Sequence, residues 1–207
     1  NPQKVQRYPR EWAQALRQMA ALRPALLLPG HGPPITGEER VQAALTETAE
    51  LLESLCEQVL ELMNAGARLD EVMTTVRAPA HLLERPYLRP IYDDPSFIVR
   101  NLWRLYGGWW DGNPASLKPA PDAKVAAELA ALSGGAGKLA ARGEALAVAG
   151  DLPLACHLVE LAAQAAPGDA EIRAIRARVY TARANGEASL MAQGVYRSAA
   201  EEEPRRS

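Results

Sequence analysis

The chain has 207 residues and a formal net charge of −2, with 48% apolar and 23% charged residues. The length suits one ordinary domain plus a remnant or two small domains, and the composition is that of a soluble globular protein. Binding to a nucleic-acid backbone needs a basic excess that this chain lacks, and no apolar run reaches the about 18 residues of a membrane span. We therefore expect neither a nucleic-acid partner nor a membrane segment.

The N-terminal sequence NPQK contains neither Met nor the apolar core of a signal peptide, which indicates a chain cut from a longer one. Cys56 and Cys156 lie in separate apolar stretches without CxxC spacing. We expect reduced core thiols. Unpaired cysteines leave both the cytoplasm and the periplasm open as compartments.

The first helix and strand of the chain have the pattern of the end of an α/β domain. Pro9 begins a short amphipathic helix that ends at Arg23-Pro24 and carries one apolar face. The face consists of Trp12, Leu16, Met19 and Ala20. The run Ala25–Leu28, closed by Pro29-Gly30, predicts a buried strand because it is too short for a helix.

A long helix follows. Thr36 and Glu39 have the spacing of a capping box, and the helix should stop at Asn64-Ala65-Gly66 after about seven turns. Its apolar positions alternate by four and three, which is a heptad seam. They are Val41, Leu45, Thr48, Leu52, Leu55, Val59 and Leu62. Such a helix is long enough to pack against another helix or another subunit.

Four prolines between residues 78 and 95 predict an extended arm. Its apolar anchors are Tyr87, Leu88, Ile91 and Tyr92. Pro95 begins a helix that ends at Gly107-Gly108 before an aromatic turn, and residues 118–122 form a second Pro-rich linker. The remaining Ala-rich sequence breaks at Gly or Pro four times and predicts four or five antiparallel helices. The spacing of Gly150-Asp151, Ala155, Ala162 and Pro167 is that of one tetratricopeptide-like hairpin.

One histidine has the setting of a metal ligand. His31 lies in the Gly-flanked loop PGHGPPI directly after the predicted strand, and a loop of this kind can hold an imidazole rigidly toward Zn²⁺. The spacing leaves the alternative of a structural or solvent-facing histidine open, because zinc needs three or four ligands and no second candidate lies nearby.

Two segments carry a resemblance to a known family. The run from Arg7 through LLLPGHGPPITG, which ends at Gly37, resembles the last helix, strand and ligand loop of a metallo-β-lactamase-fold hydrolase. Residues 100–114, RNLWRLYGGWWDGNP, are similar to the signature of the alkylsulfatase dimerisation domain. The resemblance implies a homodimeric zinc hydrolase whose helical domain follows the catalytic domain and embraces the partner.

The resemblance also implies roles for single residues. His31 matches the family's final metal-binding histidine, which completes a two-zinc centre whose other ligands come mainly from an HxHxDH motif. This chain has no such motif. We therefore expect the fragment alone to bind zinc weakly or not at all and to be inactive. Arg7 resembles the basic position near the sulfate group, with a solvated surface arginine as the alternative.

The aromatic turn offers interface residues, namely Tyr106, Trp109 and Trp110. They can staple the helical domain to the arm or contact a partner, since aromatic residues dominate interfaces, and the alternative is the wall of an alkyl channel. Asp111 before Gly112 is expected to bond its own backbone in a turn. His81 and His157 are assigned no role.

The fold expected is mainly α: a C-terminal α/β remnant of an αββα metallo-β-lactamase fold, followed by an all-α, partly tetratricopeptide-like dimerisation domain. We expect the remnant over residues 1–37, the helical domain over 38–204 and a frayed tail over 205–207. The function expected is hydrolysis of sulfate or related small-molecule esters by the intact parent, with this chain serving dimerisation and substrate-channel shaping. The alternatives are a non-catalytic dimerisation scaffold and a metallo-β-lactamase-fold hydrolase of another ester class.

Overall fold

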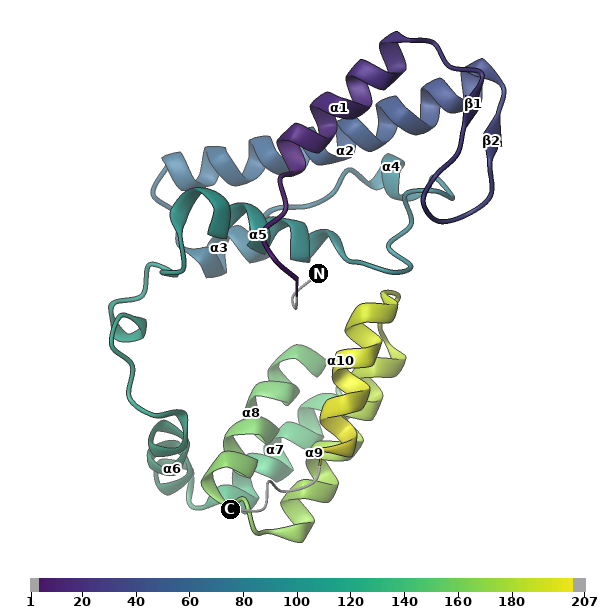
Figure 1. The fold of residues 1–207 in the computed structure, drawn as a ribbon. Coiled ribbons are helices and arrows are strands. Elements are labelled where there is room, and N and C mark those ends of the chain that lie inside the picture. The colour runs from purple at the N-terminus through teal and green to yellow at the C-terminus, as the bar shows by residue number, and fades with distance from the viewer. Residues whose placement is uncertain (1–3, 203–207) are drawn as a thin grey trace. The chain divides into compact units, whose positions relative to one another are not determined.

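A computed structural model describes residues 4–202, so the tail predicted over residues 205–207 lies outside the described residues. The chain divides into two compact units, which Figure 1 shows in sequence colours. Within the described residues, unit 1 contains residues 4–90 and 94–116, and unit 2 contains residues 91–93 and 117–202. The domain boundaries predicted at residues 37 and 204 follow a family resemblance, whereas these units follow contacts within the chain. The units therefore do not test those boundaries, which stay a prediction.

Unit 1 is built around one long helix. Its elements in chain order are α1 (Pro9–Ala21), β1 (Leu26–Leu27), β2 (Ile35–Thr36), α2 (Glu38–Asn64), α3 (Leu69–Thr75), α4 (Ala80–Leu83), α5 (Pro95–Gly107) and the 3-10 turn η1 (Pro114–Ser116). The short α3 was not predicted from the sequence. The predicted bounds of α1, α2 and α5 agree with the structure within two residues.

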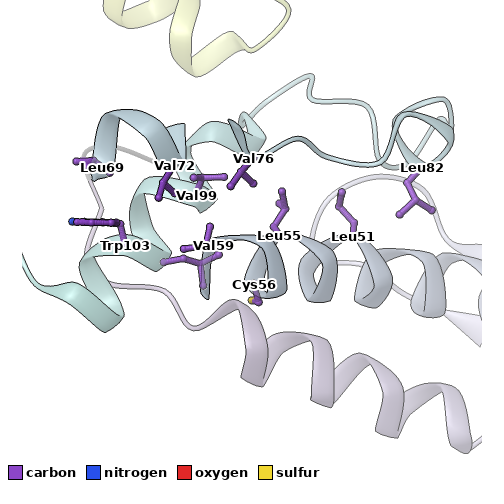
Figure 2. Close-up of a cluster of buried hydrophobic side chains, with 11 residues drawn as sticks. Leu51, Leu55, Cys56, Val59, Leu69, Val72, Val76, Leu82, Val99 and Trp103 are labelled. Carbon is purple, nitrogen blue, oxygen red and sulfur yellow. The ribbon is translucent and has the colours of Figure 1, made fainter. Parts of the chain in front are cut away.

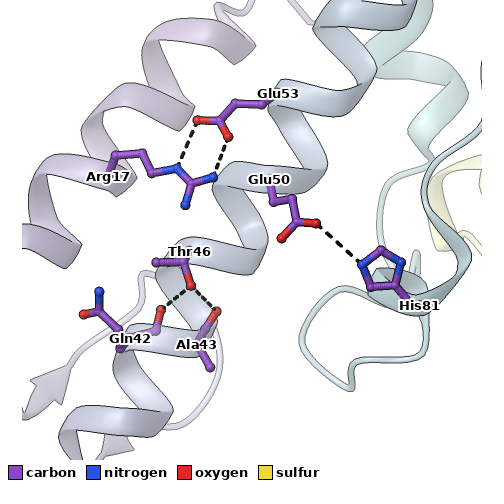
Figure 3. Close-up of polar contacts among 7 residues, drawn as sticks. All are labelled: Arg17, Gln42, Ala43, Thr46, Glu50, Glu53 and His81. Atoms are coloured by element: carbon purple, nitrogen blue, oxygen red, sulfur yellow. Dashed lines mark hydrogen bonds and ion pairs between the residues drawn. The ribbon is translucent and has the colours of Figure 1, made fainter.

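Helix α1 packs along the first half of α2, where Leu16 and Ala20 contact Val41 and Leu45 in one apolar cluster. The expected apolar face of α1 is partly wrong, since Trp12 and Met19 are exposed and Ala13 is buried instead. The small Ala13 side chain lets the two helix backbones approach closely, which the bulky indole would prevent. At the polar edge of the contact, Arg17 forms two hydrogen bonds with Glu53 (Figure 3).

The expected buried strand is also corrected. β1 and β2 form a two-stranded antiparallel ribbon that pairs Leu26 with Thr36 and Leu27 with Ile35. Leu27 and Ile35 pack against the α1–α2 cluster, whereas Leu26 is 52% exposed and Leu28 is 69% exposed. The reason is that the side chains of a strand alternate between two faces and the described residues cover only one face of this ribbon.

The heptad seam of α2 forms much of the unit's core. Val41, Leu45, Leu52, Leu55 and Val59 are buried, and Thr48 is half-buried. The second half of the seam packs against α3 and α5 in the cluster of Figure 2. The predicted capping box is wrong, because Thr36 is engaged in the ribbon and Gly37 is the N-cap without a side-chain hydrogen bond.

The arm between residues 78 and 95 follows α3 and is attached to α2 mainly by polar side chains. Only some of its expected apolar anchors are buried. Gln58 on α2 donates to the carbonyl oxygen of Arg77 and accepts from its amide. His81 lies 3.5 Å from Glu50 (Figure 3). Leu88 is half-buried against the core, but Tyr87 is 44% exposed. The short helix α4 interrupts the predicted extended chain.

Unit 2 is a stack of helices, as the breaks at Gly and Pro predicted. Its elements are α6 (Asp122–Ser133), α7 (Ala136–Val148), α8 (Leu152–Ala165), α9 (Ala170–Asn185) and α10 (Leu190–Glu201). Ala155, Val159 and Ala162 on α8 are fully buried. Gly143 on α7 faces Val159, so the two helices approach closely where small residues meet.

The last helix of unit 2 is held by residues from distant parts of the sequence. The carbonyl oxygens of Ile91 and Tyr92 accept hydrogen bonds from the amides of Leu190 and Met191 at 2.8 and 3.1 Å. The buried Ser189 hydroxyl donates to the Tyr92 carbonyl oxygen at 2.9 Å. Ile91 and Tyr92 therefore act through their backbone, and their side chains are exposed, contrary to the anchor prediction.

Arginine and tyrosine side chains link α8, α9 and α10. Arg176 pairs with Glu160 at 2.8 Å and donates to the carbonyl oxygen of Ala199. The Tyr180 and Tyr196 rings stack with their centroids 6.1 Å apart. Burial and the neighbouring Glu160 raise the pKa of Tyr180, so its hydroxyl stays a hydrogen-bond donor.

The mainly helical fold predicted from the sequence is confirmed, since the two short strands are the exception among residues 4–202. Both cysteines are free, Cys56 buried and Cys156 half-buried, and burial raises the pKa of each thiol. They are the unpaired core thiols expected. Among the described residues, no helix is long and apolar enough to cross a bilayer.

Candidate functional site

The loop that carries His31 borders a cavity of about 660 Å³ in unit 1. Its walls come from residues 29–35, from the first turns of α2 and from the arm at Pro86 and Tyr87. His31 itself is exposed. The ribbon β1–β2 fixes both ends of the loop, because Leu27 pairs with Ile35 and the Gly37 amide bonds to the Ala25 carbonyl oxygen. The loop follows β1, as the sequence predicted, and the role of His31 as a metal ligand stays a prediction.

The described residues do not form a zinc site by themselves. No group of three or more His, Cys, Asp or Glu side chains gathers in residues 4–202 at a spacing that could hold a metal ion. Zinc sites in proteins need three or four such ligands. His31 can therefore supply one ligand of a larger set, and no step of chemistry through a metal follows from this part of the chain.

A cluster of three polar side chains fixes the arm beside this cavity. The Tyr87 hydroxyl donates to the Glu47 carboxylate, and Arg85 pairs with the same carboxylate at 2.9 Å. Partial burial and the hydrogen bond to Glu47 raise the pKa of Tyr87 to about 12, so the phenol is neutral at physiological pH. Arg85 compensates the charge of the half-buried Glu47 carboxylate. This cluster was not singled out from the sequence, since Glu47 and Tyr87 are 40 positions apart.

Arg7 lies next to the signature helix α5. The Arg7 amide donates to Asn101 Oδ1 at 3.3 Å, and Asn101 Nδ2 donates to the Arg7 carbonyl oxygen at 2.9 Å. The Arg7 side chain is exposed. The structure thus joins the two segments that carried the resemblance, but Arg7 is not among the residues that line the His31 cavity.

The aromatic turn after α5 is ordered by Trp103 and Asp111. Trp103 is buried, and its Nε1 donates to the Trp110 carbonyl oxygen at 3.0 Å. Asp111 Oδ1 accepts from the Asn113 amide, as predicted for a turn residue, and this bond lowers the pKa of the Asp111 carboxyl. Trp109 is 73% exposed, and Tyr106 and Trp110 are exposed as well. The three predicted interface residues therefore lie at the surface of unit 1.

A second cavity, of about 490 Å³, lies where α3 meets the same turn. Arg68 and Arg100 line it together with Asp111 and Asn113. The lining also includes the carboxylates of Asp70 and Asp111, so the two guanidinium charges are offset within the cavity. The sequence analysis missed Arg68 and Arg100 as a pair, because α3 was not predicted and only the fold brings the two residues to one cavity.

Comparison with known proteins supports the family resemblance. The alkyl sulfatase dimerisation family matches residues 68–205. A linear primary-alkylsulfatase from Pseudomonas sp. is 35% identical over 176 residues, which cover 84% of this chain and 33% of the relative. An (R)-specific secondary-alkylsulfatase from Pseudomonas sp. is 30% identical over 153 residues, which cover 73% of this chain and 23% of the relative. The chain spans about a third or less of the length of these curated relatives.

A solved structure agrees in fold as well. The stereoselective inverting sec-alkylsulfatase Pisa1 from Pseudomonas sp. superposes with a TM-score of 0.90 at 25% sequence identity, over 99% of this chain and 34% of that one. The family match covers more than half of the chain and includes the aromatic signature. This chain belongs to the alkyl sulfatase dimerisation family.

Proposed function

We propose that this chain serves a zinc-dependent sulfate-ester hydrolase by forming its homodimer and by contributing His31 to the metal centre and Arg7 to the sulfate site. The observation that carries the proposal is that one compact unit holds the family signature on α5, the Arg7 segment bonded to Asn101 on that helix, and the His31 loop. The names of the relatives, all alkylsulfatases, supply the reaction class.

In this proposal residues 1–37 are the end of a metallo-β-lactamase-like domain. A bound zinc ion would polarise an ester oxygen and lower the pKa of a bound water. The described residues contribute two fixed backbone segments to it. The ribbon β1–β2 holds the two ends of the loop that carries His31, and the Arg7–Asn101 bonds fix the backbone that carries the Arg7 guanidinium.

The decisive experiment measures zinc content and sulfate release from octyl sulfate in the complete gene product. We expect about two zinc ions per chain, as a two-metal centre requires. His31→Ala should lower zinc content and rate together. The matched control is His157→Ala, an exposed histidine of unit 2, which should change neither. A product free of zinc, or an His31→Ala variant with full zinc and full rate, would remove the case for a metal role of His31.

The homodimer in this proposal is supported by the exposed aromatic residues Tyr106, Trp109 and Trp110. Exposed aromatic side chains next to an ordered turn are typical of interface contacts. This part of the proposal involves no metal, so it can be tested on this chain through its oligomeric state.

A further inference from the structure

We propose that residues 91–93 form a strap that holds helix α10 closed over the cavity around Cys156, so that release of the strap opens α10 as a lid. The strap, the lid and the cavity all belong to unit 2, although Tyr92 and Ser189 are 97 positions apart in the chain. The device involves neither a metal nor an ester, so it does not depend on the proposed function.

The strap provides hydrogen-bond acceptors for the start of α10. The first four amides of a helix have no acceptor within the helix itself. In α10 the amides of Leu190 and Met191 donate to the carbonyl oxygens of Ile91 and Tyr92 at 2.8 and 3.1 Å. The hydroxyl of Ser189 donates to the same Tyr92 oxygen at 2.9 Å. These hydrogen bonds join the strap to the first turn of the lid.

The preceding helix shows how a side chain can satisfy such amides instead. At the start of α9 the Asp169 carboxylate accepts from the amides of Glu171 and Ile172. Ser189 caps the Ala192 amide in the same manner, but the first two amides of α10 donate to the strap. A side-chain cap moves with its own helix, whereas a separate segment can leave it. The start of α10 therefore depends on a contact that can be broken without unfolding the helix.

Helix α10 is otherwise held with little apolar burial. Among residues 4–202, Ala192 is the one buried side chain of this helix, and Leu190 and Val195 are 54% and 41% exposed. The helix lies along α9, where the Arg176 guanidinium donates to the Ala199 carbonyl oxygen. Hydrophobic stabilisation scales with the apolar area removed from water, and a short helix has little stability of its own. Opening of α10 thus breaks few apolar contacts, and the polar contacts of the strap help to keep it closed.

The cavity that α10 helps to close has a volume of about 380 Å³. Helix α8 contributes Cys156 and His157 to its walls, α9 contributes Tyr180, and α10 contributes Tyr196. Cys156 is half-buried, and burial raises the pKa of its thiol, which keeps it protonated and slow to react at neutral pH. Because Tyr196 is carried by α10, opening of the helix removes one wall and exposes the thiol. The reactivity of Cys156 therefore reports on the lid.

The strap is connected to unit 1 through the chain. Pro90 precedes it and Asp94 follows it, and both residues are counted with unit 1. Hydrogen bonds attach the strap to α10, and peptide bonds attach it to the arm. A displacement of the arm therefore acts directly on the start of the lid.

The test measures the rate at which iodoacetamide alkylates Cys156 in the full chain, with mass spectrometry to distinguish it from Cys56. Leu190→Pro removes the amide that donates to Ile91, and the proline ring displaces that carbonyl oxygen. Proline suits the first position of a helix, and Ser189 already has the extended backbone that a residue before proline adopts. We expect Cys156 to react about five-fold faster or more, since loss of one hydrogen bond shifts an equilibrium by about two- to ten-fold. Cys56, buried in unit 1, should keep its rate.

The matched control is Ala170→Pro, which places proline at the same position of α9. Asp169 before it is extended as well, but this helix is capped by the Asp169 side chain, so the Cys156 rate should equal that of the wild type. Ser189→Ala removes the hydroxyl bond to the strap and should raise the rate in the same direction but by less. This milder variant decides the matter if Leu190→Pro does not fold.

Hydrogen exchange distinguishes a lid from unfolding of the whole of unit 2. The lid predicts faster exchange along α10 in Leu190→Pro and unchanged exchange in α8, whose Val159 side chain is fully buried. An unchanged Cys156 rate in both Leu190→Pro and Ser189→Ala would overturn the proposal. Exchange that speeds up in α8 as much as in α10 would overturn it too, because the thiol would then be exposed by unfolding of the unit.

Discussion

Tyr87 shows at the scale of a single residue how a contact distant in sequence changes a side chain's chemistry. Its pKa is raised to about 12 by partial burial and by the Glu47 carboxylate, against 10.0 for a free tyrosine. A group whose pKa is raised on folding stabilises the fold fully below its unfolded pKa. That contribution is lost as pH rises through the folded value, so Tyr87 contributes fully below pH 10 and loses its contribution between pH 10 and about 12.

We expect a difference titration of tyrosinate absorbance, wild type minus Tyr87→Phe, to give a midpoint near pH 12, the value to which the fold raises Tyr87. Glu47→Gln removes the charged acceptor and should lower that midpoint toward the free value. An unchanged midpoint in Glu47→Gln would mean that burial alone sets the pKa. Glu50→Gln, which changes a carboxylate of α2 that lies 3.5 Å from His81, is the matched control.

His31, unlike Tyr87, makes no contact from which we expect a contribution to the free energy of unfolding of this chain. Its side chain is exposed in the loop before β2. Exposed substitutions change the free energy of unfolding by no more than about 0.5 kcal/mol. We therefore expect His31→Ala to leave the urea midpoint of this chain unchanged. A loss of more than about 1 kcal/mol, outside the range for exposed sites, would show that His31 is a structural residue.

At the scale of elements, the close approach of α7 and α8 depends on Gly143. A methyl group placed there would lie 2.7 Å from Val159 Cγ1 and 3.2 Å from the carbonyl oxygen of Ala155. The second neighbour is backbone and cannot turn aside. Gly143→Ala should therefore destabilise unit 2 by about 1–3 kcal/mol, the usual cost of overpacking. The measurement is the urea midpoint followed by circular dichroism.

The same helix provides a control for this prediction. At Gly137, in the first turn of α7, a methyl group would meet no atom of the neighbouring residues within 4 Å. Gly137→Ala should stabilise the unit by about 0.5–1 kcal/mol, because alanine lowers the entropy cost of forming the helix. Equal effects at the two glycines would mean that helix propensity, not packing, sets the result at Gly143.

The start of helix α10 is held by a hydrogen bond to the carbonyl oxygen of Tyr92, which lies far earlier in the chain. Ser189 caps the Ala192 amide at 3.2 Å and also donates to the Tyr92 carbonyl oxygen. Ser189→Ala should cost about 0.5–2 kcal/mol and speed hydrogen exchange at Leu190 and Met191. Ser133→Ala, whose hydroxyl bonds within its own helix, should leave those amides protected. Unchanged exchange in Ser189→Ala would show that residues 91–93 bind α10 without the serine.

The elements that the sequence predicted well are those whose signals are local. Gly and Pro mark the ends of α2, α5 and most helices of unit 2, and the heptad seam of α2 is buried as expected. Helix α3 was missed because it has only 7 residues and is stabilised by contacts, among them the bond from the Leu69 amide to the Asp111 carbonyl oxygen. A helix of this length has little stability of its own.

The candidate site divides in the same way. The Asp111 turn could be predicted, since Asp-Gly is a local pattern, whereas the role of His31 as a metal ligand stays a prediction. The place of Tyr87 at the His31 cavity and its hydrogen bond to Glu47 could not be predicted, because both follow from how the arm folds back on α2. Trp12 shows the converse error: helical period placed it on the buried face, but the small Ala13 fits the contact with α2 instead.

At the scale of the whole molecule, membership in a family of dimerisation domains directs attention to the surface of unit 1 around the aromatic turn. Trp109 is 73% exposed at a turn whose backbone is fixed by Trp103 and Asp111. Tryptophan and tyrosine are enriched among the residues that dominate the binding energy of interfaces. Tyr106 at the end of α5 and Trp110 in the turn are exposed as well, so three aromatic side chains of this segment are available to contact a partner.

We expect light scattering to find this chain as a dimer at micromolar concentration, and Trp109→Ala to weaken the dimer by about ten-fold or more, the size of a hot-spot loss. Trp12→Ala removes an indole of similar exposure on α1 and should leave the dimer intact. If both substitutions dissociate the dimer equally, the contact is not centred on the aromatic turn. If the wild-type chain is a monomer, the interface prediction fails for this chain. The heptad seam of α2 then packs only against other residues of unit 1.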